Sequence, residues 1–125
     1  MKKLNNLSEI SNLYEAYIID LWGVMHDGVK LNPEALKVVK NLEKLGKRIT
    51  FLSNAPRPNK NVNSFLKRLN LEDKFLNYVM TSGEAAVKSL QDKKFGKKFY
   101  HIGPVRDEPL FEGLEKDKTT IEKCE

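Results

Sequence analysis

Polar residues suited to phosphoryl chemistry follow two apolar stretches of the chain. Asp20 comes directly after Ala16–Ile19, and Ser53 and Asn54 come directly after Arg48–Leu52. Both stretches are short and contain β-branched or aromatic residues, which predicts strands. A carboxylate can attack phosphorus, while a hydroxyl and backbone N–H groups can hold the phosphoryl oxygens. The pattern therefore indicates a phosphate-handling site where these strands end.

A structural interpretation of the same residues stands beside the functional one. An Asp or Ser at the end of a strand is often a turn or capping residue. Thr81 and Ser82 also follow a predicted strand, Tyr78–Met80, and with Glu84 they form a capping-box pattern that opens a helix through Leu90.

The segment between the first two strands carries the signals of a helix that brings them together. Residues 32–34, Asn-Pro-Glu, supply an N-cap, a first-turn proline and an early acid. Apolar residues then recur at helical spacing from Leu36 to Leu45, and Gly46 stands where a C-terminal cap belongs. A strand–helix–strand crossover is right-handed and makes its strands parallel, so Asp20 and Ser53 are expected at one sheet edge.

The remaining elements follow from the same periodicities. The sequence predicts a short helix over Leu7–Tyr14, a second amphipathic helix over Val62–Leu69, a fourth strand over Lys98–Ile102 and a short helix over Asp107–Leu114. Alternating strands and helices predict an α/β fold with a parallel sheet flanked by helices.

Composition narrows the function classes. The 125 residues fit one domain, with 22 basic and 17 acidic residues giving a net charge of +5. The densest basic cluster, Lys93–Lys98, lacks a recognition motif or interleaved aromatic residues, so we expect a solvated surface and no nucleic-acid partner. The single Cys124, the lack of a signal-peptide pattern and the lack of an apolar span predict a cytoplasmic protein with no membrane association.

Several other kinds of site are excluded by their missing motifs. The chain has neither a GxxxxGK[ST] nor a GxGxxG pattern, which excludes the P-loop and dinucleotide-binding classes. One cysteine and two scattered histidines do not make a zinc site. A phospho-acceptor receiver domain needs an acidic cluster after its first strand, whereas this chain has the lone Asp20 there.

Two motifs resemble those of the haloacid dehalogenase-like hydrolase superfamily. Residues 18–24, Ile-Ile-Asp-Leu-Trp-Gly-Val, are similar to its first motif, and residues 51–54, Phe-Leu-Ser-Asn, are similar to its second. Further stretches resemble its class IIA branch of sugar-phosphate and nucleotide phosphatases: Asn54–Pro58, Thr81–Ala85 and Tyr100–Pro104. The Trp-Gly-Val-x-His-Asp-Gly run resembles an uncharacterised subgroup of that branch. The likeness extends from about Ser8 to Leu114.

The resemblance implies roles for individual residues. Asp20 would be the nucleophile that forms an aspartyl-phosphate, and it would bind Mg²⁺ together with the backbone carbonyl of Trp22. Ser53 would hydrogen-bond the transferring phosphoryl group, Asn54 would support its loop, and Gly23 would permit a sharp turn.

The resemblance also implies a substrate and a domain arrangement. The substrate would be a small phosphorylated metabolite. The fold would be a partial Rossmann-like core over residues 1–95, followed by the first element of a truncated α/β cap over residues 96–125.

Two departures from the family pattern bear on activity. The general acid/base Asp that most of these phosphatases carry two residues after the nucleophile is Trp22 here, and an indole cannot exchange a proton near neutral pH. His26 and Asp27 are the available substitutes. The later Lys and acidic motifs are not recognisable, which predicts the N-terminal part of a longer enzyme, weak or inactive alone. The alternative is a non-catalytic remnant or phosphate-binding module.

Overall fold

The computed structural model describes residues 3–125. Its helices and strands are, in chain order, η1 (Leu7–Glu9), η2 (Ser11–Leu13), β1 (Ala16–Asp20), α1 (Pro33–Lys44), β2 (Arg48–Ser53), α2 (Asn59–Arg68), α3 (Asp73–Leu76), β3 (Val79–Thr81), α4 (Ser82–Gln91), η3 (Val105–Phe111) and η4 (Ile121–Lys123). The chain forms two compact units. One comprises the described residues up to Ser53 together with 65–79, and the other comprises 54–64 and 80–125.

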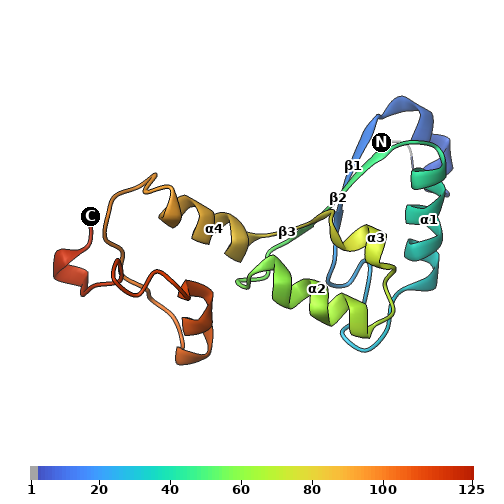
Figure 1. Cartoon of the computed structure of the whole chain (residues 1–125). Helices are drawn as coiled ribbons and strands as arrows, with labels where there is room; N and C mark the ends of the chain where they lie inside the picture. Colours follow the sequence, from blue (N-terminus) through green and yellow to red (C-terminus); the bar gives the residue numbers. More distant parts are fainter. Residues whose placement is uncertain (1–2) are drawn as a thin grey trace. The chain divides into compact units, whose positions relative to one another are not determined.

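The sheet has three parallel strands in the order β1-β2-β3, and β1 and β2 lie side by side in Figure 1. Asp20 is paired with Leu52 in the parallel register, so Ser53 is the next residue along β2 at the same edge. The predicted crossover and the shared edge of Asp20 and Ser53 are confirmed. The α/β fold with a partial Rossmann-like parallel sheet is confirmed with them.

Helix α1 forms as its end signals predict. The Asn32 side chain accepts hydrogen bonds from the backbone N–H groups of Glu34 (3.1 Å) and Ala35 (3.4 Å), which satisfies two of the unpaired donors of the first turn. Gly46 has a φ of +69°, the left-handed conformation that ends many helices. The helix contacts β2 and buries Val39 and Leu42.

The core of the first unit lies on one face of the sheet. Phe51 and Phe75 are fully buried, and their rings meet edge to face with centroids 6.5 Å apart. On the opposite face, Ile18 is 73% and Leu52 47% exposed. Parallel sheets are normally covered on both faces, so this unit presents an unusually open apolar face.

The second unit has its own smaller cluster. The rings of Phe99 and His101 pack on Phe111, with centroids 5.1 Å and 4.7 Å away. Glu108 accepts hydrogen bonds from the Lys118 ammonium and lies 3.6 Å from Nδ1 of His101. These contacts hold η3 against the residues that precede it and against Lys118, which follows it.

The helix predicted ahead of the first strand is wrong, because two 3₁₀ turns occupy that segment. Asn6 forms a capping box with Glu9, and the Ser11 hydroxyl donates to the carbonyl of Ser8 at 3.2 Å. Such local bonds from short polar side chains compete with a continuing α-helix.

The fourth strand predicted over Lys98–Ile102 is also wrong. Phe99 forms only a single bridge with Lys118, and no neighbouring strand continues it among residues 3–125. The helix predicted over Asp107–Leu114 is instead the 3₁₀ helix η3, which contains Pro109, a residue without a backbone N–H to donate. The four-residue helix α3 had no clear periodicity and was missed.

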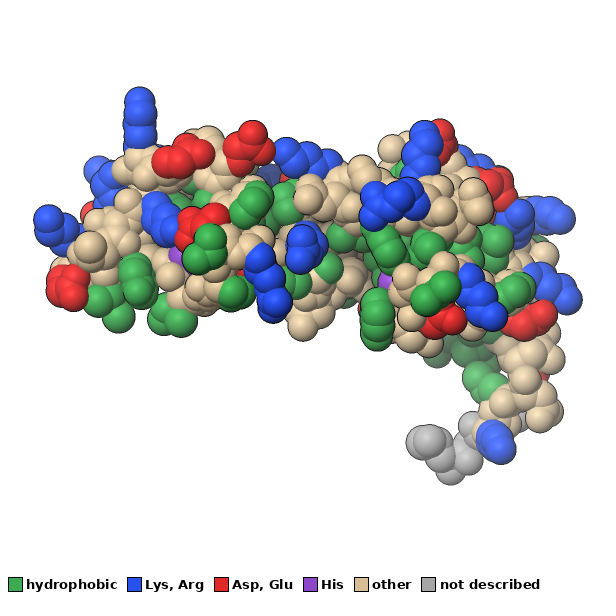
Figure 2. Space-filling model, turned by 90° about the horizontal axis from the view of Figure 1, so that it is seen from below, with side chains coloured by type: hydrophobic (Ala, Val, Ile, Leu, Met, Phe, Trp, Pro, Cys, Tyr) green, Lys and Arg blue, Asp and Glu red, His purple; other side chains and the backbone are tan. Residues whose placement is uncertain are grey.

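Positively and negatively charged side chains are mixed on the surface. On the face seen in Figure 2, Lys and Arg side chains are interspersed with Asp and Glu side chains. Within residues 3–125, no helix is both long and apolar enough to cross a bilayer.

Candidate active site

Asp20 lies exposed at the carboxyl end of β1, beside the end of β2. Its Oδ1 accepts a hydrogen bond from the backbone N–H of Leu21 at 2.7 Å. Ser53, partly buried, ends β2 one residue beyond the partner of Asp20. Asn54, the third residue of this predicted set, falls in the second compact unit. The carboxylate and the hydroxyl thus share the edge at which open α/β sheets bind ligands.

The loop after Asp20 is closely folded on one carbonyl. The backbone oxygen of Leu21 accepts from the N–H groups of Met25 (2.8 Å) and His26 (3.1 Å). Gly23, with a φ of +75°, donates its N–H to the carbonyl of His26 at 2.8 Å, as the predicted sharp turn requires. Leu21 and Met25 are at most 1% exposed, so the loop is anchored in the core.

His26 is a buried part of this loop. Only 6% of it is exposed, and its Nδ1 accepts a hydrogen bond from the N–H of Gly28 at 3.1 Å. The proton of the neutral ring therefore sits on Nε2. Burial lowers the pKa of His26, and the charges of Asp27 and Asp20 partly oppose this effect. The imidazole is therefore neutral near pH 7.

Asp27 closes the following turn. Its Oδ1 accepts from the N–H groups of Val29 and Lys30, both at 2.9 Å, which is the pattern of an Asx turn. These bonds lower the pKa of Asp27. Both predicted substitutes for the acid/base group therefore serve to hold the loop. Their catalytic role stays a prediction.

Trp22 projects from the loop two residues after Asp20. It is 67% exposed, although its ring contacts two neighbours. The indole lies perpendicular to the His26 imidazole, with centroids 5.4 Å apart. Its far end lies over Gly28, where an added Cβ would be only 2.8 Å from the indole Cη2.

The oxygen atoms at this edge suit a magnesium ion as part of its ligand set. The Asp20 carboxylate is exposed, and the Trp22 carbonyl accepts no hydrogen bond from the residues described. Both are hard oxygen donors of the kind that Mg²⁺ prefers. Within residues 3–125, no group of three or more His, Cys, Asp or Glu side chains is placed to hold a metal, so the two oxygens are only a fraction of an octahedral shell.

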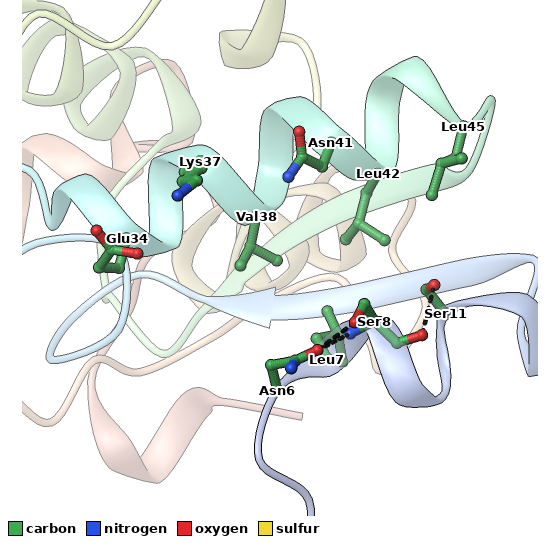
Figure 3. Close-up of a pocket in the computed structure, with 10 residues that line it drawn as sticks. All are labelled: Asn6, Leu7, Ser8, Ser11, Glu34, Lys37, Val38, Asn41, Leu42 and Leu45. Carbon is green, nitrogen blue, oxygen red and sulfur yellow. Dashed lines mark hydrogen bonds between the residues drawn. The ribbon is translucent and has the colours of Figure 1, made fainter.

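Cavities border α1 in the first unit. One of about 230 Å³ lies between the loop after Asp20 and the start of α1, and His26, Asp27 and Lys30 line it. Another, of about 360 Å³, lies between residues 6–11 and α1 (Figure 3), with Val38 and Leu42 pointing into it. Neither Asp20 nor Ser53 lines this second cavity.

In the second unit, Thr81 and Ser82 have structural partners. The Thr81 Oγ1 accepts from the N–H of Glu84 (3.0 Å) and donates to the carbonyl of Arg57 (2.6 Å). The Ser82 hydroxyl donates to the carbonyl of Ala55 at 3.0 Å. The capping role predicted for Thr81 is confirmed, and these bonds tie the start of α4 to the loop that follows the second motif.

Gly83 brings the same loop and helix into direct contact. Its N–H donates to the carbonyl of Ala55, and an added Cβ would lie 2.3 Å from the backbone nitrogen of Arg57. Glu84 in turn accepts from the N–H of Asn59 at 2.9 Å. Sequence reasoning missed this packing, although a glycine inside a capping-box pattern is a signal of close backbone approach.

The family follows from a comparison of the sequence with known families. The profile of the haloacid dehalogenase-like hydrolase family matches residues 17–115, which include both motifs and the loop after Asp20. The chain belongs to the haloacid dehalogenase-like hydrolase family. The family prediction made from the motifs is thereby confirmed, and the similar solved structures belong to the class IIA branch. A comparison with curated proteins finds no significant match.

Solved structures of this family share the fold. A haloacid dehalogenase-like hydrolase from Brucella suis is 24% identical with a TM-score of 0.75, over 98% of this chain and 44% of that chain. A p-nitrophenyl phosphatase from Archaeoglobus fulgidus is 27% identical with a TM-score of 0.69, over 88% and 42% of the two chains. A putative nagD protein is 25% identical with a TM-score of 0.63, over 79% and 39%. The chain thus spans less than half the length of each of these structures.

Proposed function

We propose that this chain carries the nucleophile part of a phosphomonoester hydrolase, with Asp20 as the attacking group. The observation that carries the proposal is the parallel register that sets the exposed Asp20 carboxylate and Ser53 at one sheet edge. Membership of the hydrolase family and similarity to a p-nitrophenyl phosphatase support the same reaction class.

The proposed reaction proceeds by two displacements at phosphorus. A carboxylate oxygen of Asp20 attacks in line, the bond to the ester oxygen breaks, and the alkoxide leaves and takes up a proton. Water then attacks the aspartyl-phosphate, which releases inorganic phosphate and regenerates the carboxylate. The Ser53 hydroxyl hydrogen-bonds the phosphoryl oxygens during transfer, and Asn54 supports its loop.

Magnesium fits the oxygen donors of this edge. We assign the Asp20 carboxylate and the Trp22 backbone carbonyl to its shell, with the remaining ligands coming from water, the phosphate and other groups of the hydrolase. When bound, the ion would neutralise phosphate charge.

Proton transfer is the weak point of the proposed site. Trp22 replaces the usual acid/base residue, and a lost general acid/base typically lowers the rate by about 10²–10⁴. His26 and Asp27 remain the nearest candidates for the acid/base role, although both side chains are engaged in hydrogen bonds within the loop. We therefore propose slow turnover.

The wider setting follows from the same family assignment. We propose a small phosphorylated metabolite as the substrate and the cytoplasm as the location, since a single cysteine fits a reducing compartment. We also propose that residues 1–95 belong to the hydrolase core and that residues 96–125 belong to its cap.

A second function is favoured by the tryptophan at the acid/base position. Because the indole of Trp22 cannot exchange a proton near neutral pH, it favours a module that binds a phosphate group without turnover. Binding of a phosphate ester with no Asp20-dependent hydrolysis would select this second function.

The test is Mg²⁺-dependent phosphate release from p-nitrophenyl phosphate by the chain and by its Asp20→Asn variant. The proposal predicts slow release that falls by at least about 10³-fold in the variant, because the carboxamide is not a nucleophile. A matched Asp92→Asn variant makes the same carboxyl-to-amide change at an exposed residue outside the proposed site, so its release rate should equal that of the unaltered chain. Release that survives in Asp20→Asn at the original rate would refute the assignment.

A further inference from the structure

The indole of Trp22 is held in place yet open to solvent. It is the single tryptophan of the chain, and 67% of it is exposed. An exposed aromatic side chain that is held in a fixed orientation offers a flat apolar surface to which a ligand can bind. Its surroundings show what restricts it and what remains accessible.

Contacts on one side of the indole restrict its orientation. The His26 imidazole meets it at an interplanar angle of 88°, and that imidazole is itself fixed by the Gly28 N–H and by the Phe65 ring, 5.1 Å away. Gly28 lacks the Cβ that would collide with the end of the indole. A perpendicular neighbour covers less of an aromatic ring than a stacked one does, so ring surface remains available for stacking.

The indole also stands next to the nucleophile. Trp22 follows Asp20 by two residues, directly after the carboxyl end of β1. The indole packs on the His26 imidazole, and the His26 N–H donates to the carbonyl of Leu21, the residue between Asp20 and Trp22. A phosphate ester attacked by Asp20 would therefore have its leaving group within reach of an aromatic surface.

We propose that Trp22 is a stacking platform for the substrate's leaving group and selects phosphate esters that carry a planar aromatic ring. This inference rests on the proposed function for its nucleophile. The proposal also explains why a tryptophan occupies position 22. An indole cannot transfer a proton, but it can stack on an aromatic ring of the ligand. An aliphatic ligand cannot form this contact. An aromatic leaving group is a weaker base than an alkoxide and depends less on a general acid.

The test compares phenyl phosphate with cyclohexyl phosphate, which has the same ring size and charge but no aromatic face. Both are titrated with Mg²⁺ into the Asp20→Asn chain, where turnover is blocked, by calorimetry and by Trp22 fluorescence. We expect phenyl phosphate to bind about threefold to tenfold more tightly, which corresponds to the usual free energy of an aromatic pair. It should also change the emission of Trp22. Trp22→Leu should bring the ratio to about one, while Trp22→Phe should keep most of it.

Val29→Ala is the matched control, because Val29 lies in the same loop, is 81% exposed and should not alter the ratio. Adenosine monophosphate carries its ring farther from the phosphate than phenyl phosphate does. If adenosine monophosphate binds more tightly, the platform fits a nucleobase better than an aryl ring. Equal affinities for the phenyl and cyclohexyl esters, or a ratio unchanged in Trp22→Leu, would overturn the platform. Asp20-dependent hydrolysis without aromatic preference would retain the proposed function, whereas aromatic preference without such hydrolysis would retain only the platform.

Discussion

The two compact units of this chain are stabilised in different ways. In the first, the most deeply buried side chains are apolar and include Phe51, Phe75 and Leu21. In the described part of the second, the most deeply buried side chain is Thr81, whose hydroxyl bonds two backbone groups. Apolar burial thus positions the proposed nucleophile, whereas polar capping positions the loop after the second motif.

Because of this difference, we expect different kinds of substitution to destabilise the two units most. Apolar burial contributes free energy roughly in proportion to area, so a cavity in the first unit is costly. Polar caps depend on a few directional bonds, so the second unit is sensitive to small displacements of its backbone. Variants in each unit can test this distinction.

The largest effect is expected from Phe51→Ala in the first unit. Phe51 is fully buried against Phe75, and such truncations cost about 3–5 kcal/mol in the free energy of unfolding. Leu52→Ala is the control, because Leu52 points to the exposed face of the same strand. Denaturant titration followed by circular dichroism measures both. Equal losses in the two variants would contradict the assignment of the core to one face.

A smaller effect, confined to the second unit, is expected from Gly83→Ala. The added Cβ would collide with the backbone of Arg57, and the forced shift should cost about 1–3 kcal/mol. Hydrogen exchange should show faster exchange at the start of α4 and unchanged protection in β1. Ala86→Ser, an exposed change in the same helix, serves as the control. Unchanged exchange in Gly83→Ala would show that the close approach to Arg57 is not needed.

The smallest effect is expected from the Glu108–Lys118 pair. Hydrogen bonding from Lys118 lowers the pKa of Glu108 below its ordinary value of 4.5, and the nearby His101 adds to this. The stabilisation is therefore complete above pH 4.5 and is lost as the pH falls through the lowered pKa.

Hydrogen exchange at η3 measures this dependence. Protection should fall on acidification in the wild-type chain, and Glu108→Gln should already show the reduced protection at neutral pH. The amides of β2 provide the internal reference. An acid-dependent loss at η3 of the same size in Glu108→Gln would rule out this carboxylate as its cause.

Much of the first unit could be predicted because its signals are local and mutually consistent. Asn32-Pro33 and Gly46 mark the ends of α1, and a helix between two strands allows one handedness of crossover. That rule alone predicts that Asp20 and Ser53 lie at one edge of the sheet. The family profile matches residues 17–115, which include both of these residues.

The rest depended on contacts that no periodicity encodes. The Phe99 segment has the composition of a strand but no partner strand in the described chain, so it forms a single bridge. The burial of His26 and the fit of Trp22 over Gly28 arise from how the loop folds on the Leu21 carbonyl. An Asp-Gly pair such as Asp27-Gly28 is typical of turns, but its sequence does not show which side chains pack on the turn.

The most direct test of Asp20 as the nucleophile is to locate the phosphoryl group during turnover. The chain is mixed with p-nitrophenyl phosphate and Mg²⁺, quenched in acid, digested and analysed by mass spectrometry, with Asp20→Asn as the control. The account predicts a phosphorylated peptide that contains Asp20, with the modification on that carboxylate and absent from the variant. A phosphoryl group on another residue, or phosphate release with Asp20 never modified, would contradict it.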